Sequence, residues 1–316
     1  MRVLVLGAGG IGGYFGARLH DAGGDITFMV RPARAENLRA HGLRVASPLG
    51  DTALVPQLIA EGDDAGGGFD VIMLSCKAYD LDAAVDDIAP MLHSGSVVLP
   101  LLNGLAHLDK LDARFGRARV LGGVAHVSVA LGPAGQIRHL NKFQRLIFGS
   151  RGQEPSPWLA PLEQLMAASP VSFTVSEHIE QDMWEKFVFL ATLAGATCTM
   201  RANVGEILST CAGESFITGL LGECEQIAAA SGYPASPEKL AVYREQLNDR
   251  GSTVAASMLR DIGRDGPTEA DHILGDLVAR GDRLGIEVPL LKLAYSHLQA
   301  YELVRQRRQA DKDGAT

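Results

Sequence analysis

The sequence predicts an α/β domain built on a parallel sheet, followed by an all-helical domain. Short apolar runs alternate with segments of helical spacing through the first half, and strand-like runs stop after about residue 177. The length of 316 residues also favours two domains, because one hydrophobic core rarely grows beyond about 250–300 residues. We therefore place the α/β domain at residues 1–177 and the helical domain at residues 178–316.

The first domain alternates strands and helices in a regular order. Strands are predicted at Val3–Leu6, Asp25–Val30, Asp70–Ser75 and Ser96–Leu102, and helices at Ile11–Ala22, Ala33–His41 and Leu81–Met91. This alternation predicts parallel strands with helices on both faces of the sheet. The glycines at 66–68 indicate a surface loop before the third predicted strand.

Beyond Arg119 the pattern changes to longer strand-like runs. Two of them, Val120–Leu131 and Gln136–Phe148, flank the turn signal Gly-Pro-Ala-Gly at 132–135. They predict an antiparallel hairpin or an edge extension of the sheet. A helix at Pro155–Ser169 and a strand at Val171–Val175 complete the first domain.

The second domain is predicted to be entirely helical. Segments of helical spacing, separated by Gly or Pro, occur at Glu177–Thr199, Ser215–Ser231, Pro237–Asn248, Thr268–Leu284 and Leu290–Arg308. The polar tail Gln309–Thr316 should be mobile. The apolar C-terminal helices suggest contact between subunits, as in a homodimer.

Composition and charge exclude several classes of protein. The formal net charge of −8 argues against a nucleic-acid-binding protein, which would carry a basic stripe. The four cysteines are far apart, so we expect buried free thiols in a reducing compartment and no metal site. The apolar run Phe187–Met200 is too short to span a bilayer, and no signal peptide precedes Val3–Leu6. We expect a soluble, cytoplasmic protein that binds neither nucleic acid nor membrane.

A glycine-rich loop lies between the first predicted strand and the first predicted helix. Its sequence, Gly7-Ala8-Gly9-Gly10-Ile11-Gly12, has the pattern G-x-G-x-x-G. The first glycine permits a tight turn, the second lets the backbone approach a pyrophosphate, and the third lets helix and strand pack closely. The helix N-terminus favours phosphate as well. The context predicts a Rossmann domain that binds a dinucleotide through Gly7, Gly9, Gly10, Ile11 and Gly12.

The residues after the second predicted strand indicate which dinucleotide binds. An NAD enzyme usually has Asp or Glu there, to bind the ribose hydroxyl groups. This chain instead has Val30-Arg31-Pro32-Ala33-Arg34, which contains no carboxylate. Arg31 and Arg34 can bind a 2′-phosphate through charge-assisted hydrogen bonds, so the sequence predicts NADPH as the cofactor.

Polar residues at predicted strand ends are candidates for the chemistry, because ligands bind at the carboxyl ends of parallel strands. Three such ends are Ser75-Cys76-Lys77, Leu102-Asn103-Gly104 and Val124-Ala125-His126. Asn103 can hydrogen-bond a ribose or a substrate carbonyl group, and Lys77 can supply positive charge near the cofactor or the substrate.

Seven short motifs occur along nearly the whole chain. They are GAGGIG at 7–12, VRP at 30–32, CKAYD at 76–80, LNG at 102–104, WEKF at 184–187, SMLRDI at 257–262 and PTEADHILG at 267–275. Their order and spacing resemble those of the ketopantoate reductase (2-dehydropantoate 2-reductase) family. The resemblance implies a Rossmann domain that binds NADPH and a helical domain that closes over a 2-oxo acid. It also implies reduction of that acid, with ketopantoate, a precursor in pantothenate biosynthesis, as the first candidate.

The resemblance assigns catalytic roles to two residues. Lys186 matches the family's catalytic lysine, which hydrogen-bonds the ketone oxygen and stabilises or protonates the alkoxide. Glu269 matches an acidic residue that binds substrate and orients the site. The residues alone leave two alternatives for Lys186, which borders the apolar run Phe187–Met200. It is either partly desolvated, and so a better acid near neutral pH, or extended into solvent.

The resemblance also assigns binding roles. Ser257 matches a serine that holds the substrate carboxylate, and Arg31 matches a basic residue near the 2′-phosphate. Asn103 and Lys77 match residues at the nicotinamide side of the cleft.

The chain departs from the family at three positions. Leu190, Ala194 and Val254 stand where ketopantoate-specific members have asparagines that contact the substrate. A hydroxylated substrate without these partners should bind worse by about 1–3 kcal/mol per buried group left unpaired. We therefore expect a 2-oxo acid that is more apolar than ketopantoate or differently shaped.

Two other functions stay open on the sequence alone. A non-enzymatic NADP(H)-binding sensor would share the first domain, although it need not keep Lys186 and Glu269. A β-hydroxy-acid dehydrogenase shares the plan of a Rossmann domain and a helical domain and also uses a lysine, but with different flanking residues.

Overall fold

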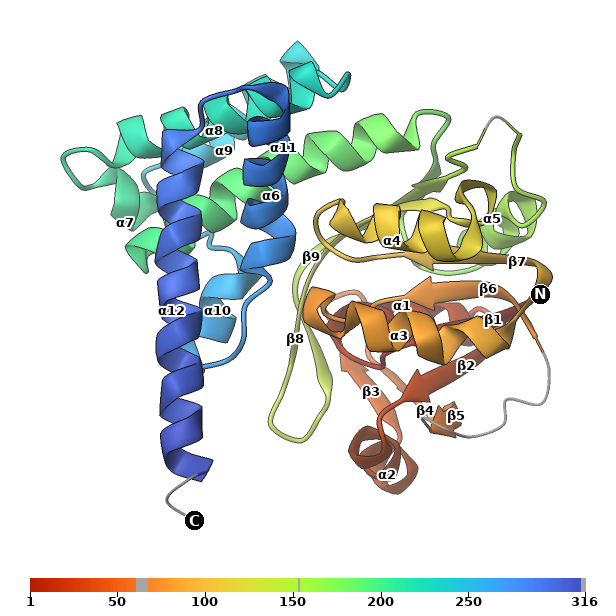
Figure 1. The fold of residues 1–316 in the computed structure, drawn as a ribbon. Helices are drawn as coiled ribbons and strands as arrows, with labels where there is room; N and C mark the ends of the chain where they lie inside the picture. The colour runs from red at the N-terminus through yellow and green to blue at the C-terminus, as the bar shows by residue number, and fades with distance from the viewer. Residues whose placement is uncertain (61–67, 153, 314–316) are drawn as a thin grey trace. The chain divides into compact units, whose positions relative to one another are not determined.

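The computed structural model describes residues 1–60, 68–152 and 154–313, which divide into two compact units (Figure 1). The first unit contains Met1–Leu102 and His107–Asp182. The second contains Asn103–Ala106 and continues from Met183. The division falls within helix α6 (Ile179–Met200), a few residues beyond residue 177.

The first unit is built on a parallel sheet of five strands. They are β1 (Arg2–Leu6), β2 (Asp25–Val30), β5 (Gln57–Ala60), β6 (Phe69–Leu74) and β7 (Leu92–Pro100). Their order is β5-β2-β1-β6-β7, and every neighbouring pair is parallel. The chain therefore begins in the middle of the sheet, and the strand order reverses between β1 and β6. Open parallel sheets bind ligands at the carboxyl ends of strands beside such a point.

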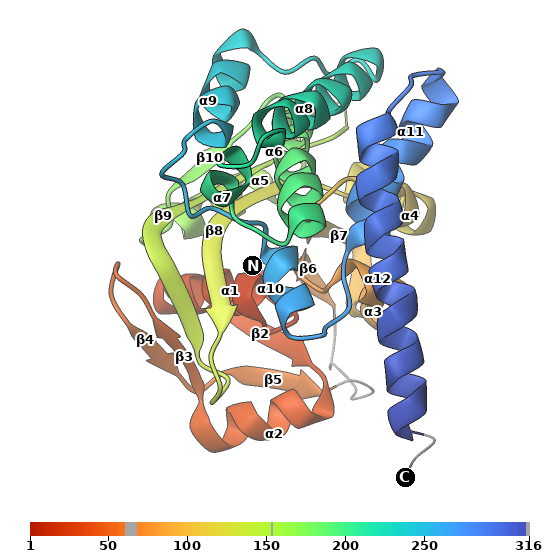
Figure 2. The ribbon, with the colours of Figure 1, turned by 90° about the vertical axis from the view of Figure 1, so that its left-hand side faces the viewer.

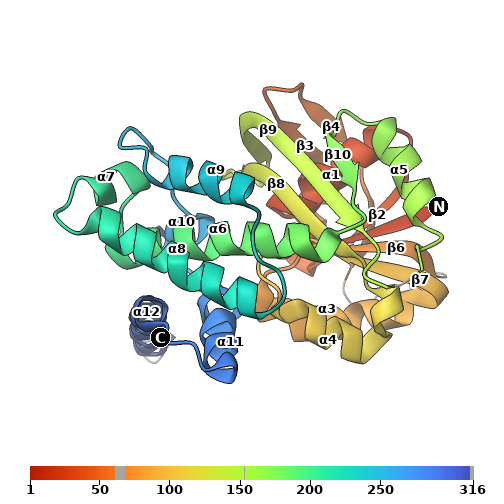
Figure 3. The same ribbon diagram turned by 90° about the horizontal axis from the view of Figure 1, so that it is seen from above.

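Helices cover both faces of this sheet, as the sequence predicts. They are α1 (Gly10–Asp21), α2 (Pro32–His41), α3 (Leu81–Ile88), α4 (Ala106–Phe115) and α5 (Leu159–Ala167). Helix α1 contacts β1 and β2 on one side and a second sheet on its other side. Helices α3 and α4 lie on the opposite face of the parallel sheet (Figure 3). Strands β1, β2 and β6 are buried along nearly their whole length, which explains their continuous apolar runs.

The second sheet contains the predicted antiparallel hairpin (Figure 2). Strand β8 (Gly122–Leu131) pairs with β9 (Ile137–Gly149), so the hairpin is confirmed. The sheet order is β10-β9-β3-β4, which adds β10 (Phe173–Val175), β3 (Leu43–Ala46) and β4 (Thr52–Leu54). An edge extension of the parallel sheet is limited to one isolated bridge between Val98 and Val120.

One predicted strand end is wrong. Val124, Ala125 and His126 lie inside β8, which continues to Leu131. The His126 ring packs against Phe143 of the neighbouring strand, with ring centroids 6.2 Å apart. Because β8 belongs to the antiparallel hairpin, these residues are not at the carboxyl edge of the parallel sheet.

The second unit is helical, as predicted. Besides α6 it contains α7 (Val204–Leu208), α8 (Gly213–Ala230), α9 (Pro237–Leu247), α10 (Ser257–Gly263), a π-helical turn (Asp271–Gly275), α11 (Asp276–Leu284) and α12 (Pro289–Asp313). The core of α6 is the buried apolar run, including Phe187, Val188 and Cys198. Within the described residues, no helix combines the length and apolarity needed to cross a bilayer.

Three predictions at loops and ends need comment. Residues 309–313 of the predicted mobile tail continue α12, which ends at Asp313 and not at the predicted Arg308. Residues 314–316 lie outside the described residues, as do Gly66 and Gly67 of the predicted loop. The predicted helix Thr268–Leu284 begins only at Ala270, and its first part is the π-helical turn.

Candidate functional site

The loop between β1 and α1 forms a tight turn. Gly7 has a φ of +94°, where a residue with a side chain would be strained. Its N–H donates to the Met29 carbonyl oxygen at 2.9 Å. The Ser75 hydroxyl donates to the carbonyl oxygen of Leu6 at 2.8 Å. These bonds tie the loop to β2 and to the end of β6.

Gly12 and Gly9 have different surroundings. A Cβ atom on Gly12 would overlap the Ser75 hydroxyl and the Gly7 carbonyl oxygen, so glycine is needed for the packing of helix and loop. A Cβ atom on Gly9 would meet no described heavy atom within 4 Å. The backbone at Gly9 therefore faces open space, which is what a pyrophosphate needs.

The N-terminus of α1 favours an anion. Gly9 is its N-cap and contributes no side-chain hydrogen bond, and the described first turn contains no acidic residue. The first N–H groups of a helix lack intrahelical acceptors and carry the positive end of its dipole. Gly10, Ile11 and Gly12 form this turn, so the structure brings the predicted phosphate-binding residues together.

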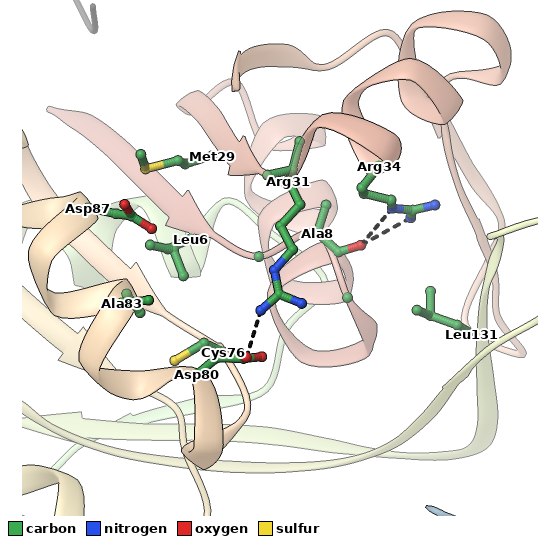
Figure 4. Close-up of a pocket in the computed structure, with 14 residues that line it drawn as sticks. Leu6, Ala8, Met29, Arg31, Arg34, Cys76, Asp80, Ala83, Asp87 and Leu131 are labelled. Carbon is green, nitrogen blue, oxygen red and sulfur yellow. Dashed lines mark hydrogen bonds and ion pairs between the residues drawn. The ribbon is translucent and has the colours of Figure 1, made fainter. Parts of the chain in front are cut away.

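A cavity of about 320 Å³ lies beside this loop (Figure 4). It is lined by Leu6, Gly7, Ala8, Gly9, Met29, Val30, Arg31, Arg34, Cys76, Asp80, Ala83, Ala84, Asp87 and Leu131. Most of the wall is apolar, and two arginines and two aspartates supply its charge. Apolar walls with a few charged groups suit a nucleotide.

The two arginines of the cavity have different partners. Arg31 Nη2 lies 2.7 Å from Asp80 Oδ1. Arg34 donates from Nε and Nη2 to the Ala8 carbonyl oxygen, at 3.2 and 3.0 Å, and from Nη1 to Asn37. Burial lowers the pKa of Arg34. Arg34 therefore braces the glycine-rich loop, whereas Arg31 extends across the cavity toward α3 (Figure 4).

The sequence reasoning missed the wall formed by α3 and the residue before it. Asp80, Ala83, Ala84 and Asp87 line the cavity at spacings of three and four residues, which places them on one helix face. The sequence prediction rests on the end of the second strand, which has no carboxylate. The sequence signal for this wall is the helical spacing after Cys76.

Two predicted cofactor residues lie elsewhere. Lys77 precedes a short 3₁₀ turn, Ala78–Asp80, in the first unit. Asn103 belongs to the second unit. Neither is among the described residues that line the cavity.

Lys186 and Asn103 meet within the second unit. Lys186 Nζ donates to Asn103 Oδ1 at 3.2 Å. Gly104 follows Asn103 with a φ of +81°, and a Cβ atom there would lie 3.0 Å from the His272 carbonyl oxygen. Glycine therefore permits both the turn and the close packing that hold Asn103 in this unit.

The Lys186 ammonium group is desolvated. Burial lowers its pKa from 10.5 to about 8, and the charge of Glu269 opposes this shift. Glu269 is itself only 8% exposed. An ammonium group with this pKa is protonated at neutral pH and gives up its proton readily. The Lys186 ammonium group thus supplies a proton donor for an oxygen that gains negative charge. The Asn103 amide oxygen accepts a hydrogen bond from it, and the Glu269 carboxylate favours its protonated form.

Neighbouring contacts hold the segments that carry these residues. The Trp184 ring stacks on Tyr233, with centroids 5.7 Å apart, and the Arg280 guanidinium lies over it at 5.3 Å. Near Glu269, the Thr268 N–H and hydroxyl groups both donate to Glu302. The π-helical turn begins two residues after Glu269, and such turns are frequent at functional sites.

The predicted substrate-binding positions occupy three segments of the second unit. Leu190 and Ala194 follow Lys186 by one and two turns of α6, so the three residues share a face. Leu190 is half-buried, Ala194 is fully buried, and Val254 is 50% exposed. Ser257, the first residue of α10, is half-buried.

The four cysteines are free thiols, as predicted, but their predicted burial is wrong for the exposed Cys211, and Cys76 is only partly buried. Burial raises the pKa of Cys198 and of Cys224 to about 12, so both are unreactive. Across the described residues, no group of three or more His, Cys, Asp and Glu side chains could hold a metal ion.

Two family models match this chain. The model described as "Ketopantoate reductase PanE/ApbA" matches residues 3–153. The model described as "Ketopantoate reductase PanE/ApbA C terminal" matches residues 178–302. Together they cover most of the chain.

Individual proteins are similar over nearly their full length. The uncharacterized oxidoreductase YkpB of Bacillus subtilis (strain 168) is 37% identical over 302 residues, which cover 96% of this chain and 99% of that protein. The 2-dehydropantoate 2-reductase of Mesorhizobium japonicum is 26% identical and covers 87% of this chain and 89% of that protein. A PanE/ApbA family ketopantoate reductase structure from Ralstonia eutropha JMP134 has 25% identity and a TM-score of 0.87, over 97% of this chain and 100% of that chain.

A fourth similarity concerns the fold alone. The structure of D-mandelate dehydrogenase with NADH and anilino(oxo)acetate has a TM-score of 0.87 at 21% identity. It covers 97% of this chain and 100% of that chain.

Proposed function

Because this chain belongs to the ketopantoate reductase family, we propose that it reduces a 2-oxo acid to the 2-hydroxy acid with NADPH. The observation that carries this proposal is the desolvated ammonium group of Lys186, which donates to Asn103 and interacts with Glu269. A protein that only senses NADP(H) has no need of such a group, whereas an enzyme that protonates its substrate needs a general acid.

The first unit would hold the cofactor. The loop at Gly7 and Gly9 and the N-terminus of α1 would bind the pyrophosphate, and Arg31 would bind the 2′-phosphate. NADPH bound there supplies the hydride for the ketone carbon. Lys77 would add positive charge at the nicotinamide side.

The second unit would serve the substrate. When the ketone carbon is reduced, its oxygen gains negative charge, and Lys186 donates a hydrogen bond and then its proton to that oxygen. Water then reprotonates the neutral amine. Asn103 orients the ammonium group, and the negative charge of Glu269 keeps its pKa from falling further. Ser257 would bind the substrate carboxylate.

The substrate is proposed as a class. Ketopantoate is the first 2-oxo acid to test, and its product would enter pantothenate biosynthesis. The apolar Leu190, Ala194 and Val254 favour a more apolar or differently shaped acid, because they offer no hydrogen bond to substrate hydroxyl groups.

A panel assay tests the proposal. NADPH oxidation is followed with ketopantoate and with 2-oxo acids that carry straight, branched and aromatic side chains. We expect turnover, with the highest kcat/KM for an acid more apolar than ketopantoate. If ketopantoate is the best substrate, the proposed specificity is wrong. Tight NADPH binding without turnover of any acid would indicate a sensor, and preferred oxidation of a 3-hydroxy acid with NAD would indicate a β-hydroxy-acid dehydrogenase.

We further propose that residues 1–177 and 178–316 act as the cofactor domain and the substrate domain of a cytoplasmic homodimer. Leu293 and Leu303 of α12 are 59% and 68% exposed, which leaves apolar surface for a second subunit. Light scattering on the purified chain should give the mass of a dimer, and a monomer at all concentrations would contradict this assembly.

A further inference from the structure

The cofactor cavity contains a carboxylate that the sequence at the end of β2 does not predict. The end of β2 has only basic residues, which favour a 2′-phosphate. Asp80 nevertheless reaches the same cavity from the segment after β6, and its Oδ1 lies 2.7 Å from Arg31 Nη2 (Figure 4). NAD enzymes use a carboxylate at the end of the second strand to bind the ribose 2′-hydroxyl, and Asp80 brings the same group to the cavity from a different segment.

Arg31 is the cation best placed for a 2′-phosphate. Arg34 directs three of its five N–H donors to the Ala8 carbonyl oxygen and to Asn37, so most of its guanidinium is engaged by the loop and by α2. Arg31 is 66% exposed and forms an ion pair with Asp80. A phosphate bound by Arg31 would therefore also meet the negative charge of Asp80.

The carboxylate of Asp80 pairs with a residue of the cavity and does not cap the helix. Asp80 is the N-cap residue of α3, yet its side chain makes no capping hydrogen bond to the described helix. It points to Arg31 instead (Figure 4). An ion pair this exposed is weak, so a ligand can compete for either member of the pair.

We propose that Asp80 is a specificity-determining residue that reduces the preference for NADPH over NADH. Its carboxylate accepts a hydrogen bond from a 2′-hydroxyl and competes with a 2′-phosphate for Arg31. The negative charge also repels the phosphate. The inference rests on the proposed binding of a nicotinamide dinucleotide to this cavity, and it extends that proposal to the choice between two cofactors.

The test is a direct measurement of binding. Dissociation constants of NADPH and of NADH are determined by calorimetry on the full chain, for the wild type and for Asp80→Asn. We expect Asp80→Asn to raise the affinity ratio of NADPH to NADH by about fivefold, because it removes one close carboxylate and leaves the shape unchanged. The melting temperature of each variant shows whether it is folded.

Three further variants make the result specific. Asp82→Asn removes a carboxylate of the same helix that pairs with Lys110 and lies outside the cavity lining, so the ratio should not change. Asp87→Asn removes the second carboxylate of the cavity and should change the ratio less than Asp80→Asn. Arg31→Gln should lower the ratio, and the effect of Asp80→Asn should shrink when Arg31→Gln is already present.

The outcomes separate the two proposals. An unchanged or lower ratio in Asp80→Asn overturns the role of Asp80 while leaving dinucleotide binding intact. An equal change of the affinity ratio in Asp82→Asn would show that only net charge matters, and this result would overturn the role of Asp80 too. If the wild type binds neither dinucleotide, the proposed function is wrong and the inference falls with it.

Discussion

The glycine-rich loop of the first unit and the group formed by Lys186, Asn103 and Glu269 in the second, here called the lysine cluster, are built on different principles. The loop is made of backbone: Gly7, Gly9 and Gly12 lie within six consecutive residues, and what matters is the absence of side chains. The cluster is made of side chains, and Lys186 and Asn103 are 83 positions apart in the sequence. A backbone site is damaged by adding atoms, whereas a side-chain site is damaged by removing them.

Removing the lysine side chain should have the largest effect. Lys186→Met keeps most of the volume and removes the proton donor, so we expect kcat to fall by about 10²–10⁴-fold. NADPH affinity should stay unchanged, because the phosphate loop is intact. Steady-state kinetics and calorimetry measure the two quantities. Lys142→Met, at an exposed lysine, is the control. A near-normal kcat in Lys186→Met would show that the reaction does not depend on this side chain.

Adding one methyl group to the loop should have the next largest effect. In Gly12→Ala the Cβ atom collides with the Gly7 carbonyl oxygen, so the melting temperature and NADPH affinity should both fall, the latter by about tenfold or more. In Gly9→Ala the methyl group enters open space, so only NADPH affinity should fall. Gly222→Ala, where a Cβ atom also has no described neighbour within 4 Å, is the control. A large loss of stability in Gly9→Ala would be inconsistent with the open loop.

The third effect is a change of rate with pH. The acid form of Lys186 is needed, so kcat should fall as pH rises through the pKa of about 8. In Glu269→Gln the charge that raises this pKa is lost, and the falling limb should move to lower pH. The pH profiles of kcat for the wild type and for Glu269→Gln give the position of the falling limb in each protein. A limb at the same pH in wild type and variant would show that Glu269 does not act on Lys186.

The smallest expected effect concerns the choice of substrate. Leu190→Asn places an amide one turn after Lys186, at a half-buried position. We expect kcat/KM for ketopantoate to rise a few-fold relative to an apolar 2-oxo acid, as one hydrogen bond of about 1 kcal/mol would give. Leu293→Asn, on the exposed side of α12, should leave this ratio unchanged. A lower ratio in Leu190→Asn would place Leu190 outside the substrate pocket.

The sequence predicts the centre of the parallel sheet well because β1, β2 and β6 are buried on both faces. Strand β2 is found with its bounds, Asp25–Val30, since a run such as DITFMV leaves few alternatives. Strands β3, β4 and β5 are missed, because they have only three or four residues and an alternating or mixed burial pattern. Helix α4 is missed for a similar reason, since half of Ala106–Phe115 is polar and it is preceded by Leu105, whose side chain cannot cap a helix.

The two sites differ in the same way. The phosphate loop can be predicted because its residues are contiguous and each glycine is needed for a known structural reason, such as a tight turn or close packing. The pairing of Lys186 with Asn103 could be expected only through family resemblance, because no local pattern links residues that far apart. Asp80 was missed although its spacing to Ala83, Ala84 and Asp87 indicates a common helix face.

The short segment Asn103–Ala106 has a consequence for how the chain is made. It leaves the ribosome with the first unit, yet it belongs to the compact unit that begins at Met183. The first unit can therefore acquire its sheet early, whereas this segment must wait until most of the polypeptide has been synthesised. A fragment that ends at Asp182 should accordingly be cut by proteases between Asn103 and Ala106, and the full-length chain should be protected there.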